Sequence, residues 1–266
     1  MKKTLINIRT LLTTGLALSA VTAISIATPL AAFTTPTFAA PQANAQCATT
    51  PSKLSASYIL ESSNGGQSRN SELVLYRNGK TVAHHYPQTQ ITESWYLSPN
   101  QQVKPTRFFD SAERAIEYQP GEKVHGKTET DWDYRNNLIS QALLSQLDLV
   151  KETGTGCELT RHYSKTIGHT KISVQWAVEQ SLLLEYSWQQ DNKKEMWTLT
   201  EVNHDAKEVD RFFAQRSQYQ TTDFADIGDD HSDPFLTKMV TLGFIEKGAS
   251  GFYDDKGNAL AGGHHH

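Results

Sequence analysis

Residues 73–83 have the sequence LVLYRNGKTVA, and this segment gives the clearest indication of the fold. The dipeptide Asn78-Gly79 is the strongest signal for a two-residue turn, and the residues beside it favour β-strands. The sequence therefore predicts a hairpin over residues 71–86. Pairing across the turn puts Leu73, Leu75, Val82 and His84 on one face and Val74, Tyr76, Thr81 and Ala83 on the other. Because both faces are partly apolar, we expect a sheet that is covered on both sides or curled around a core.

Alternation between apolar and polar residues continues through most of residues 55–202. It is clear in segments 172–178, 182–188 and 196–202, and Asp191-Asn192 predicts the turn between the last two. Evenly spaced antiparallel strands are typical of a meander that is closed or half-closed. The predicted fold class is mainly β (α+β), a curved antiparallel half-barrel sheet with a packed helix and a small helical C-terminal extension.

Three segments interrupt the strand pattern. Residues 131–149 are predicted as a helix with Thr130 as a candidate cap, because apolar residues recur there at helical spacing. Residues 206–215 and the segment opened by Asp233-Pro234 are predicted as short amphipathic helices. The predicted organisation is a signal peptide over 1–45, an antiparallel β domain over 46–205, and an extension over 206–266 with an Asp-rich loop and a His-ended tail.

The first 45 residues have the layout of a secretory signal. Lys2, Lys3 and Arg9 form a positive start, and residues 10–52 contain no charged side chain. Ala43-Asn44-Ala45 fits a signal peptidase site, which predicts cleavage before Gln46 and a location in the periplasm. The alternatives are an earlier cut after Ala39 and an uncleaved membrane anchor, because the apolar stretch is long enough to span a bilayer. After cleavage we expect no stable membrane span.

Charge restricts the class of partner. The whole chain has a net charge of −4, and loss of the three basic residues of the signal makes it −7. The longest run of basic residues after the signal is Lys193-Lys194. Phosphate binding needs clustered Lys and Arg, so this composition argues against nucleic acid and anionic membranes as partners.

The two cysteines, Cys47 and Cys157, both follow the predicted cleavage site. An isolated pair in an oxidising compartment predicts a structural disulfide. Closing a loop of about 100 residues would contribute up to about 4–5 kcal/mol. A redox or metal-thiolate site is the alternative, but the chain has no C-x-x-C motif.

The Asp-rich loop offers candidate metal ligands. Five aspartates fall within residues 223–233, and the candidate ligands are Asp229, Asp230 and His231 together with the terminal His264, His265 and His266. Carboxylates suit Ca²⁺, whereas histidines shift the preference toward Zn²⁺ or Cu²⁺. The alternative is a solvated loop in which Asp233 caps the following helix. The terminal histidines are either a native tail or the remnant of a purification tag.

Three common catalytic motifs are missing from the sequence. It contains no G-x-S-x-G, no H-E-x-x-H and no G-x-G-x-x-G. We therefore predict no catalytic residue and no required cofactor.

Aromatic residues are frequent in the β segment, and a half-closed sheet can leave an apolar cavity that holds one hydrophobic ligand. The segment 73–80, then Trp95, the segment RAIEY at 114–118 and the late hairpin over 184–200 resemble the LolA/LppX-type family of periplasmic lipoprotein carriers. The resemblance covers about residues 55–203. It implies an unclosed half-barrel whose helices line an apolar cavity for acyl chains.

The sequence thus leads to one main hypothesis and two alternatives. The main hypothesis is a non-catalytic periplasmic protein that binds an apolar ligand, such as a lipid or a lipidated peptide, in a half-barrel cavity. The first alternative is a periplasmic protein that binds a divalent metal. The second is a docking module for another envelope protein, which would expose Phe235, Phe244 and Phe252.

Overall fold

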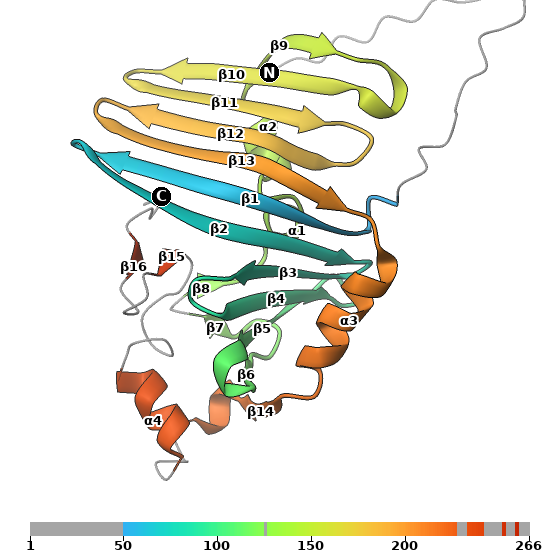
Figure 1. The fold of residues 1–266 in the computed structure, drawn as a ribbon, viewed down its shortest axis with the longest axis vertical. Coiled ribbons are helices and arrows are strands. Elements are labelled where there is room, and N and C mark those ends of the chain that lie inside the picture. Colours follow the sequence, from blue (N-terminus) through green and yellow to red (C-terminus); the bar gives the residue numbers. More distant parts are fainter. Residues whose placement is uncertain (1–49, 125–126, 228–232, 242–251, 254–258, 261–266) are drawn as a thin grey trace, which may run out of the picture. The chain divides into compact units, whose positions relative to one another are not determined.

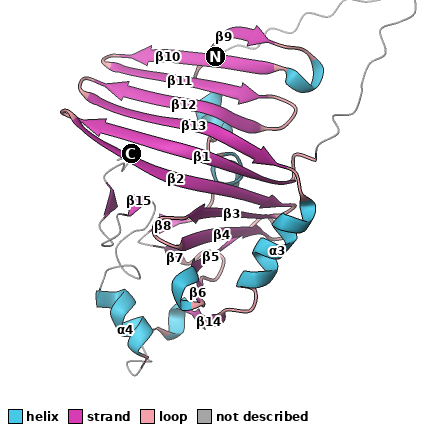
Figure 2. Cartoon of the chain, viewed as in Figure 1, coloured by secondary structure: helices cyan, strands magenta, loops and turns pink. Residues whose placement is uncertain are grey.

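A twelve-stranded sheet dominates the computed structural model, which describes residues 50–124, 127–227, 233–241, 252–253 and 259–260 (Figures 1 and 2). The order is β14-β6-β5-β4-β3-β2-β1-β13-β12-β11-β10-β9, and the first strand does not pair with the last. All neighbouring strands are antiparallel except β14 and β6. The predicted class, a mainly β fold with an unclosed antiparallel sheet, is confirmed.

The strands and helices have the following bounds. The strands of the large sheet are β1 Lys53–Asn64, β2 Gln67–Asn78, β3 Thr81–Tyr86, β4 Ile91–Leu97, β5 Val103–Phe109, β6 Arg114–Glu117, β9 Asp148–Thr153, β10 Thr160–Ile167, β11 Thr170–Ala177, β12 Leu182–Gln190, β13 Lys193–Asn203 and β14 Gln220–Asp223. Two small ribbons pair β7 Lys123–Val124 with β8 Lys127–Thr128, and β15 Phe252–Tyr253 with β16 Ala259–Leu260. The helices are α1 Trp132–Asn137, α2 Gln141–Leu144, α3 Ala206–Arg216 and α4 Pro234–Thr241, with 3-10 turns at η1 Asp110–Ala112, η2 Gly156–Glu158 and η3 Phe224–Asp226.

The predicted hairpin forms as expected. Asn78 pairs with Thr81 across the turn, and Gly79 has a φ of 63°, which glycine adopts without strain. Leu75 pairs with His84, so these side chains share the predicted face. His85 therefore points to the opposite face of the sheet.

The sheet has an inner face, against which α1 and α2 pack, and an outer face. The inner-face core contains Leu54, Leu75, Val174 and Trp197 from the strands and Leu144 from α2. A second apolar cluster lies at the β4–β6 side and contains Ile91, Phe109, Ile116, Tyr118, Ile227, Leu236 and Met239. On the outer face Phe212 of α3 stacks on Tyr76 of β2, with ring centroids 3.6 Å apart. Both faces are thus covered around this hairpin, which is the first of the two predicted arrangements.

The predicted helix over 131–149 is wrong in its extent. α1 begins after Asp131, which accepts a hydrogen bond from the Tyr134 amide, and ends where Leu138 has a φ of 61°. Ser140 then caps the short α2, and residues from 148 onward form the edge strand β9. Tertiary contacts explain the break, because the Asn136 carbonyl accepts a hydrogen bond from the buried Arg77 at 2.8 Å.

The two C-terminal helices are confirmed. Asp205 accepts a hydrogen bond from the Lys207 amide at the start of α3. Asp233 accepts hydrogen bonds from the amides of Phe235 and Leu236 at the start of α4, at 2.7 and 3.3 Å. Between these helices β14 pairs with β6, so part of the extension belongs to the large sheet.

Candidate functional site

A strip of apolar side chains on the inner face is only partly covered. We call it the open apolar strip and define it as Leu149, Tyr163, Ile167, Ile172 and Trp188. Strand pairing places these residues on one face, because Tyr163 pairs with both Leu149 and the core residue Val174, and Ile172 pairs with Trp188. Leu149 is 52% exposed and Ile167 is 58% exposed, whereas the other three are half-buried.

The open apolar strip continues the inner-face core. Tyr163, Ile172 and Trp188 pack against that core, in which Tyr186 meets Trp197 edge-to-face at 5.6 Å between ring centroids. The opposite face of the same strands is polar, and the hydroxyls of Ser173 and Ser187 lie 2.7 Å apart there. This half of the sheet is therefore amphipathic, with its apolar side incompletely covered.

Charged side chains are buried between the two apolar clusters, beneath α1. Glu93 of β4 and Arg107 of β5 form an ion pair with side chains 11% and 4% exposed. Glu129 and Arg135 form a second pair at 2.6 Å, and the Arg135 guanidinium lies 4.2 Å from the centre of the Trp95 ring. Arg107 and Arg135 thus each have a carboxylate partner, which offsets part of the cost of burying their charges.

His84 lies beside these two ion pairs, and its side chain is 2% exposed. Its Nε2 is 2.7 Å from the Arg135 carbonyl oxygen, which can only accept, so the proton must be on Nε2. Burial, and then the positive charge of Arg135, lower the pKa of His84 to about 3. The imidazole is consequently neutral at physiological pH.

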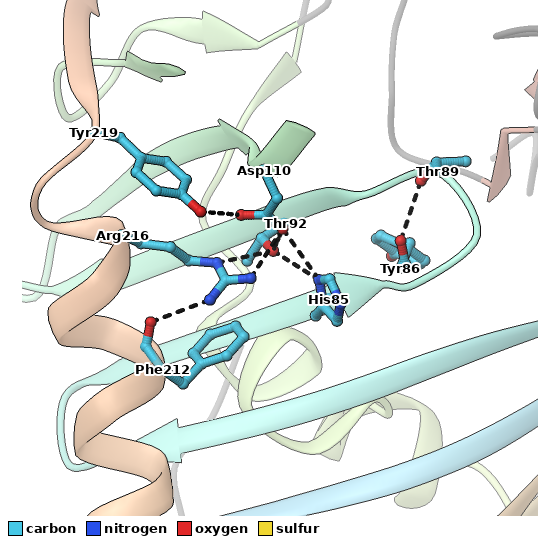
Figure 3. A network of polar contacts seen from close by, with 8 residues as sticks. All are labelled: His85, Tyr86, Thr89, Thr92, Asp110, Phe212, Arg216 and Tyr219. Atoms are coloured by element: carbon cyan, nitrogen blue, oxygen red, sulfur yellow. Dashed lines mark hydrogen bonds and ion pairs between the residues drawn. The ribbon is translucent and has the colours of Figure 1, made fainter. Parts of the chain in front are cut away.

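The outer face has a separate polar network that holds α3 on the sheet (Figure 3). The Arg216 guanidinium donates to Asp110 Oδ2 at 2.9 Å and to Thr92 Oγ1 at 3.1 Å. Thr92 in turn donates to Asp110 Oδ2 at 2.7 Å and lies 2.9 Å from His85 Nδ1, while Tyr219 donates to Asp110 Oδ1 at 3.2 Å. Burial would raise the pKa of Asp110, but hydrogen bonds from His85, Thr92 and Arg216 and the Arg216 charge lower it.

This network is structural. Thr92 is fully buried, so no substrate can reach its hydroxyl even though a histidine and an aspartate lie beside it. Arg216 also lies 3.6 Å above the Phe212 ring, and Phe212 stacks on Tyr76. Polar and aromatic contacts therefore attach the same helix to the outer face.

Replacement of Asp110 by asparagine is expected to lower the free energy of unfolding by about 2 kcal/mol. The change removes the charge that balances Arg216, and hydrogen bonds to charged groups contribute about 1.5–3 kcal/mol each. Asp210→Asn is the matched control, because Asp210 joins α3 to Lys53 at 2.6 Å through an exposed pair, and exposed pairs contribute about 0–1 kcal/mol. Urea denaturation of both variants measures the difference, and equal losses would show that the buried network does not hold α3.

The predicted metal ligands Asp229, Asp230, His231 and His264–His266 lie outside the described residues. Within the described ranges no group of three or more His, Cys, Asp or Glu is placed to hold a metal ion. Asp233 caps α4, as expected for a solvated loop, and also forms an ion pair with Arg114 at 2.6 Å. Asp223 accepts hydrogen bonds from the side-chain Nε2 of Gln119 at 2.6 Å and from the backbone amide of Ala225 at 3.0 Å.

Several other predictions fall wholly or partly outside the described residues. The signal peptide and Cys47 do so completely, as do Phe244 and the terminal histidines. Cys157, in η2, is not a free cysteine, but its pairing with Cys47 stays a prediction. Among the residues that the structure describes, no helix has the length and apolar character needed to cross a membrane.

A small pocket of about 180 Å³ opens near the ends of β1, β2 and β13. It is lined by Glu61, Ser62, Ser63, Ser68, Asn70, Lys194 and Met196. This lining is mostly polar, so the pocket does not match the predicted apolar cavity.

Sequence reasoning missed part of the open apolar strip. Leu149 was included in the predicted helix, and Tyr163 and Ile167 lie in a strand with the sequence TRHYSKTI, whose alternation is weak. The next two strands of the sheet, β11 and β12, supply the usable signal, because Ile172 and Trp188 lie in clearly alternating segments. The exposure of the residues in the open apolar strip depends on where the helices above the sheet end, and the sequence did not show these ends.

No protein-family model and no curated protein sequence matches the chain. Solved structures do match. A structure of PNGF-II is 8% identical, with 64% of this chain and 31% of that chain covered and a TM-score of 0.34. The chain thus spans less than a third of that PNGF-II chain.

Two shorter structures are also similar. A DUF1329 family protein from Desulfovibrio piger is 7% identical, with 61% of this chain and 89% of that chain covered and a TM-score of 0.33. A domain described as an outer membrane lipoprotein-sorting protein, from Vibrio parahaemolyticus, is 8% identical, with 62% and 92% covered and a TM-score of 0.31. A lipoprotein-sorting domain is thus among the similar structures.

Proposed function

We propose that the protein is a non-catalytic periplasmic carrier that binds one apolar ligand, a lipid or a lipidated peptide, against the inner face of its open sheet. The observation that carries this proposal is the open apolar strip. Apolar area that remains beside a packed core is available for a ligand, and each buried methylene contributes about 0.8 kcal/mol. The export signal predicted for residues 1–45 supports the periplasmic location.

Ile172→Asp is expected to weaken the binding of a fluorescent fatty acid more than about tenfold. The substitution removes apolar contact area from the centre of the strip and would place a charge against the acyl chain. Ser173→Asp is the matched control, because Ser173 is the next residue of β11 and points to the polar outer face. We expect this control to bind the fatty acid within about twofold of the unchanged protein.

Fluorescence titration measures the affinity of the two variants for the fatty acid, and circular dichroism shows whether both variants fold. Equal affinities would place the fatty acid elsewhere. Organic extraction of the purified protein, followed by mass spectrometry, supplies an independent readout. If no lipid is extracted and no fatty acid binds, the carrier proposal fails.

A further inference from the structure

Three hairpin turns lie side by side at one end of the sheet (Figure 1). They connect β1 to β2, β12 to β13, and β10 to β11. The Gly65 amide donates to the Asn192 carbonyl at 3.4 Å, and His169 Nδ1 lies 3.9 Å from Asp191 Oδ1. We call this region the hairpin end and define it as residues 64–69, 165–171 and 189–194.

The hairpin end is basic although the chain is acidic. It contains five basic residues, Arg69, Lys165, Lys171, Lys193 and Lys194, and one acidic residue, Asp191, in a chain with a net charge of −4. All five except the half-buried Lys165 are exposed. Glu61 and Glu195 are the nearest acidic side chains further along the strands, and Glu195 accepts a hydrogen bond from Trp197. A positive surface is thus concentrated on three adjacent turns.

An exposed apolar side chain lies within this basic region and connects it to the open apolar strip. Ile167, at the tip of β10, is 58% exposed. It shares the inner face with Lys165, which pairs with Ile172, and Ile172 pairs with Trp188. The apolar strip therefore begins at the hairpin end and runs inward along the strands.

We infer that the hairpin end docks on an anionic phospholipid surface, where Ile167 enters the outer part of the bilayer and an apolar ligand passes between the bilayer and the strip. The transfer step rests on the proposed function. Charge complementarity supports the docking, because each Lys or Arg near an anionic leaflet contributes about 1 kcal/mol. Dissolved salt limits such attraction to a range of about 10 Å. The charges on the turns nearest the membrane therefore affect binding more than the net charge of the whole chain does. The net charge and the lack of long basic runs in the sequence argued against anionic membranes. The inference departs from that expectation, because the fold brings basic residues from three separate turns together.

The test is flotation of the purified protein with vesicles of phosphatidylcholine alone or with about 30% phosphatidylglycerol. We expect binding to the anionic vesicles that falls as salt is raised. Replacing Lys171, Lys193 and Lys194 together by glutamine should weaken this binding about 100-fold, from about 1 kcal/mol per residue. The matched control replaces Lys80, Lys207 and Arg211, which are exposed and lie outside the hairpin end, and should change binding less than about threefold.

A second pair of variants tests the apolar contact. Ile167→Ser should weaken vesicle binding about tenfold, whereas Val150→Ser, at a residue that is 68% exposed on β9 outside the hairpin end, should have little effect. No preference for anionic vesicles, or equal losses in the two triple variants, would overturn the inference. Fatty acid binding in solution separates the two proposals. If it is absent while docking still depends on the hairpin end, the proposed function fails and the docking surface stands.

Discussion

Replacement of Arg77 by methionine is expected to lower the free energy of unfolding by about 3–5 kcal/mol, because several buried hydrogen-bond acceptors lose their donor. Arg77 is 1% exposed, and burial lowers its pKa to about 10, so it remains charged at neutral pH. Its guanidinium donates five hydrogen bonds to segments far apart in the sequence. The acceptors are the carbonyls of Pro51, Asn136, Gln180 and Ser181 and the side chain of Asn137, at 2.7–3.2 Å.

The effect of Arg77 arises from the acceptors that its removal leaves unsatisfied. Each buried carbonyl without a donor costs about 1–3 kcal/mol, partly offset because the buried charge is also removed. Arg69→Met is the matched control, because Arg69 lies on the same strand and is exposed. We expect this control to change the free energy of unfolding by less than about 0.5 kcal/mol. Urea denaturation followed by circular dichroism measures both.

If Arg77→Met does not fold, Arg77→Lys provides a milder change. An ammonium group has three donors and can reach only some of the five acceptors, so we expect a smaller loss that is still above that of Arg69→Met. An unfolding free energy for Arg77→Lys equal to that of Arg69→Met would contradict the assigned role.

Arg77 also shows where prediction from the sequence succeeded and where it failed. The Asn78-Gly79 turn and the cap Asp233 were predicted because these signals act over a few residues. The five partners of Arg77 could not be predicted from its place before a turn, because they depend on which distant segments meet there. The same contacts end α1 near Asn136, so the error in the helix over 131–149 has a tertiary cause.

The candidate site was predicted only in outline. An apolar inner face follows from the strand alternation, and the open sheet is confirmed. Which aromatic residues remain uncovered depends on the order of strands and on the helices above them. Trp95 and Trp197 are 4% and 7% exposed in the core, whereas Trp188 is half-buried in the strip. The alternation of all three is similar, so the sequence could not distinguish them.

The stability of the protein is expected to fall as the pH drops below about 6.5, because of His84. In the unfolded chain this histidine takes up a proton near pH 6.5, whereas in the folded protein burial and Arg135 lower its pKa to about 3. Between these values the unfolded state binds a proton that the folded state does not. The contribution of the neutral imidazole is therefore complete above pH 6.5 and decreases by about 1.4 kcal/mol for each pH unit below it.

The glutamine variant of His84 isolates this contribution. Glutamine has an N–H group that can donate to the Arg135 carbonyl, and it does not titrate. Between pH 7.5 and pH 5, the unchanged protein should lose about 2 kcal/mol more unfolding free energy than His84→Gln does. His204→Gln, at an exposed position after β13, serves as the control and should have the pH dependence of the unchanged protein. Parallel stability curves for the unchanged protein and His84→Gln would mean that His84 becomes protonated in the folded state. A protonated His84 would then lie beside the positive charge of Arg135, so the buried charges beneath α1 would have to rearrange.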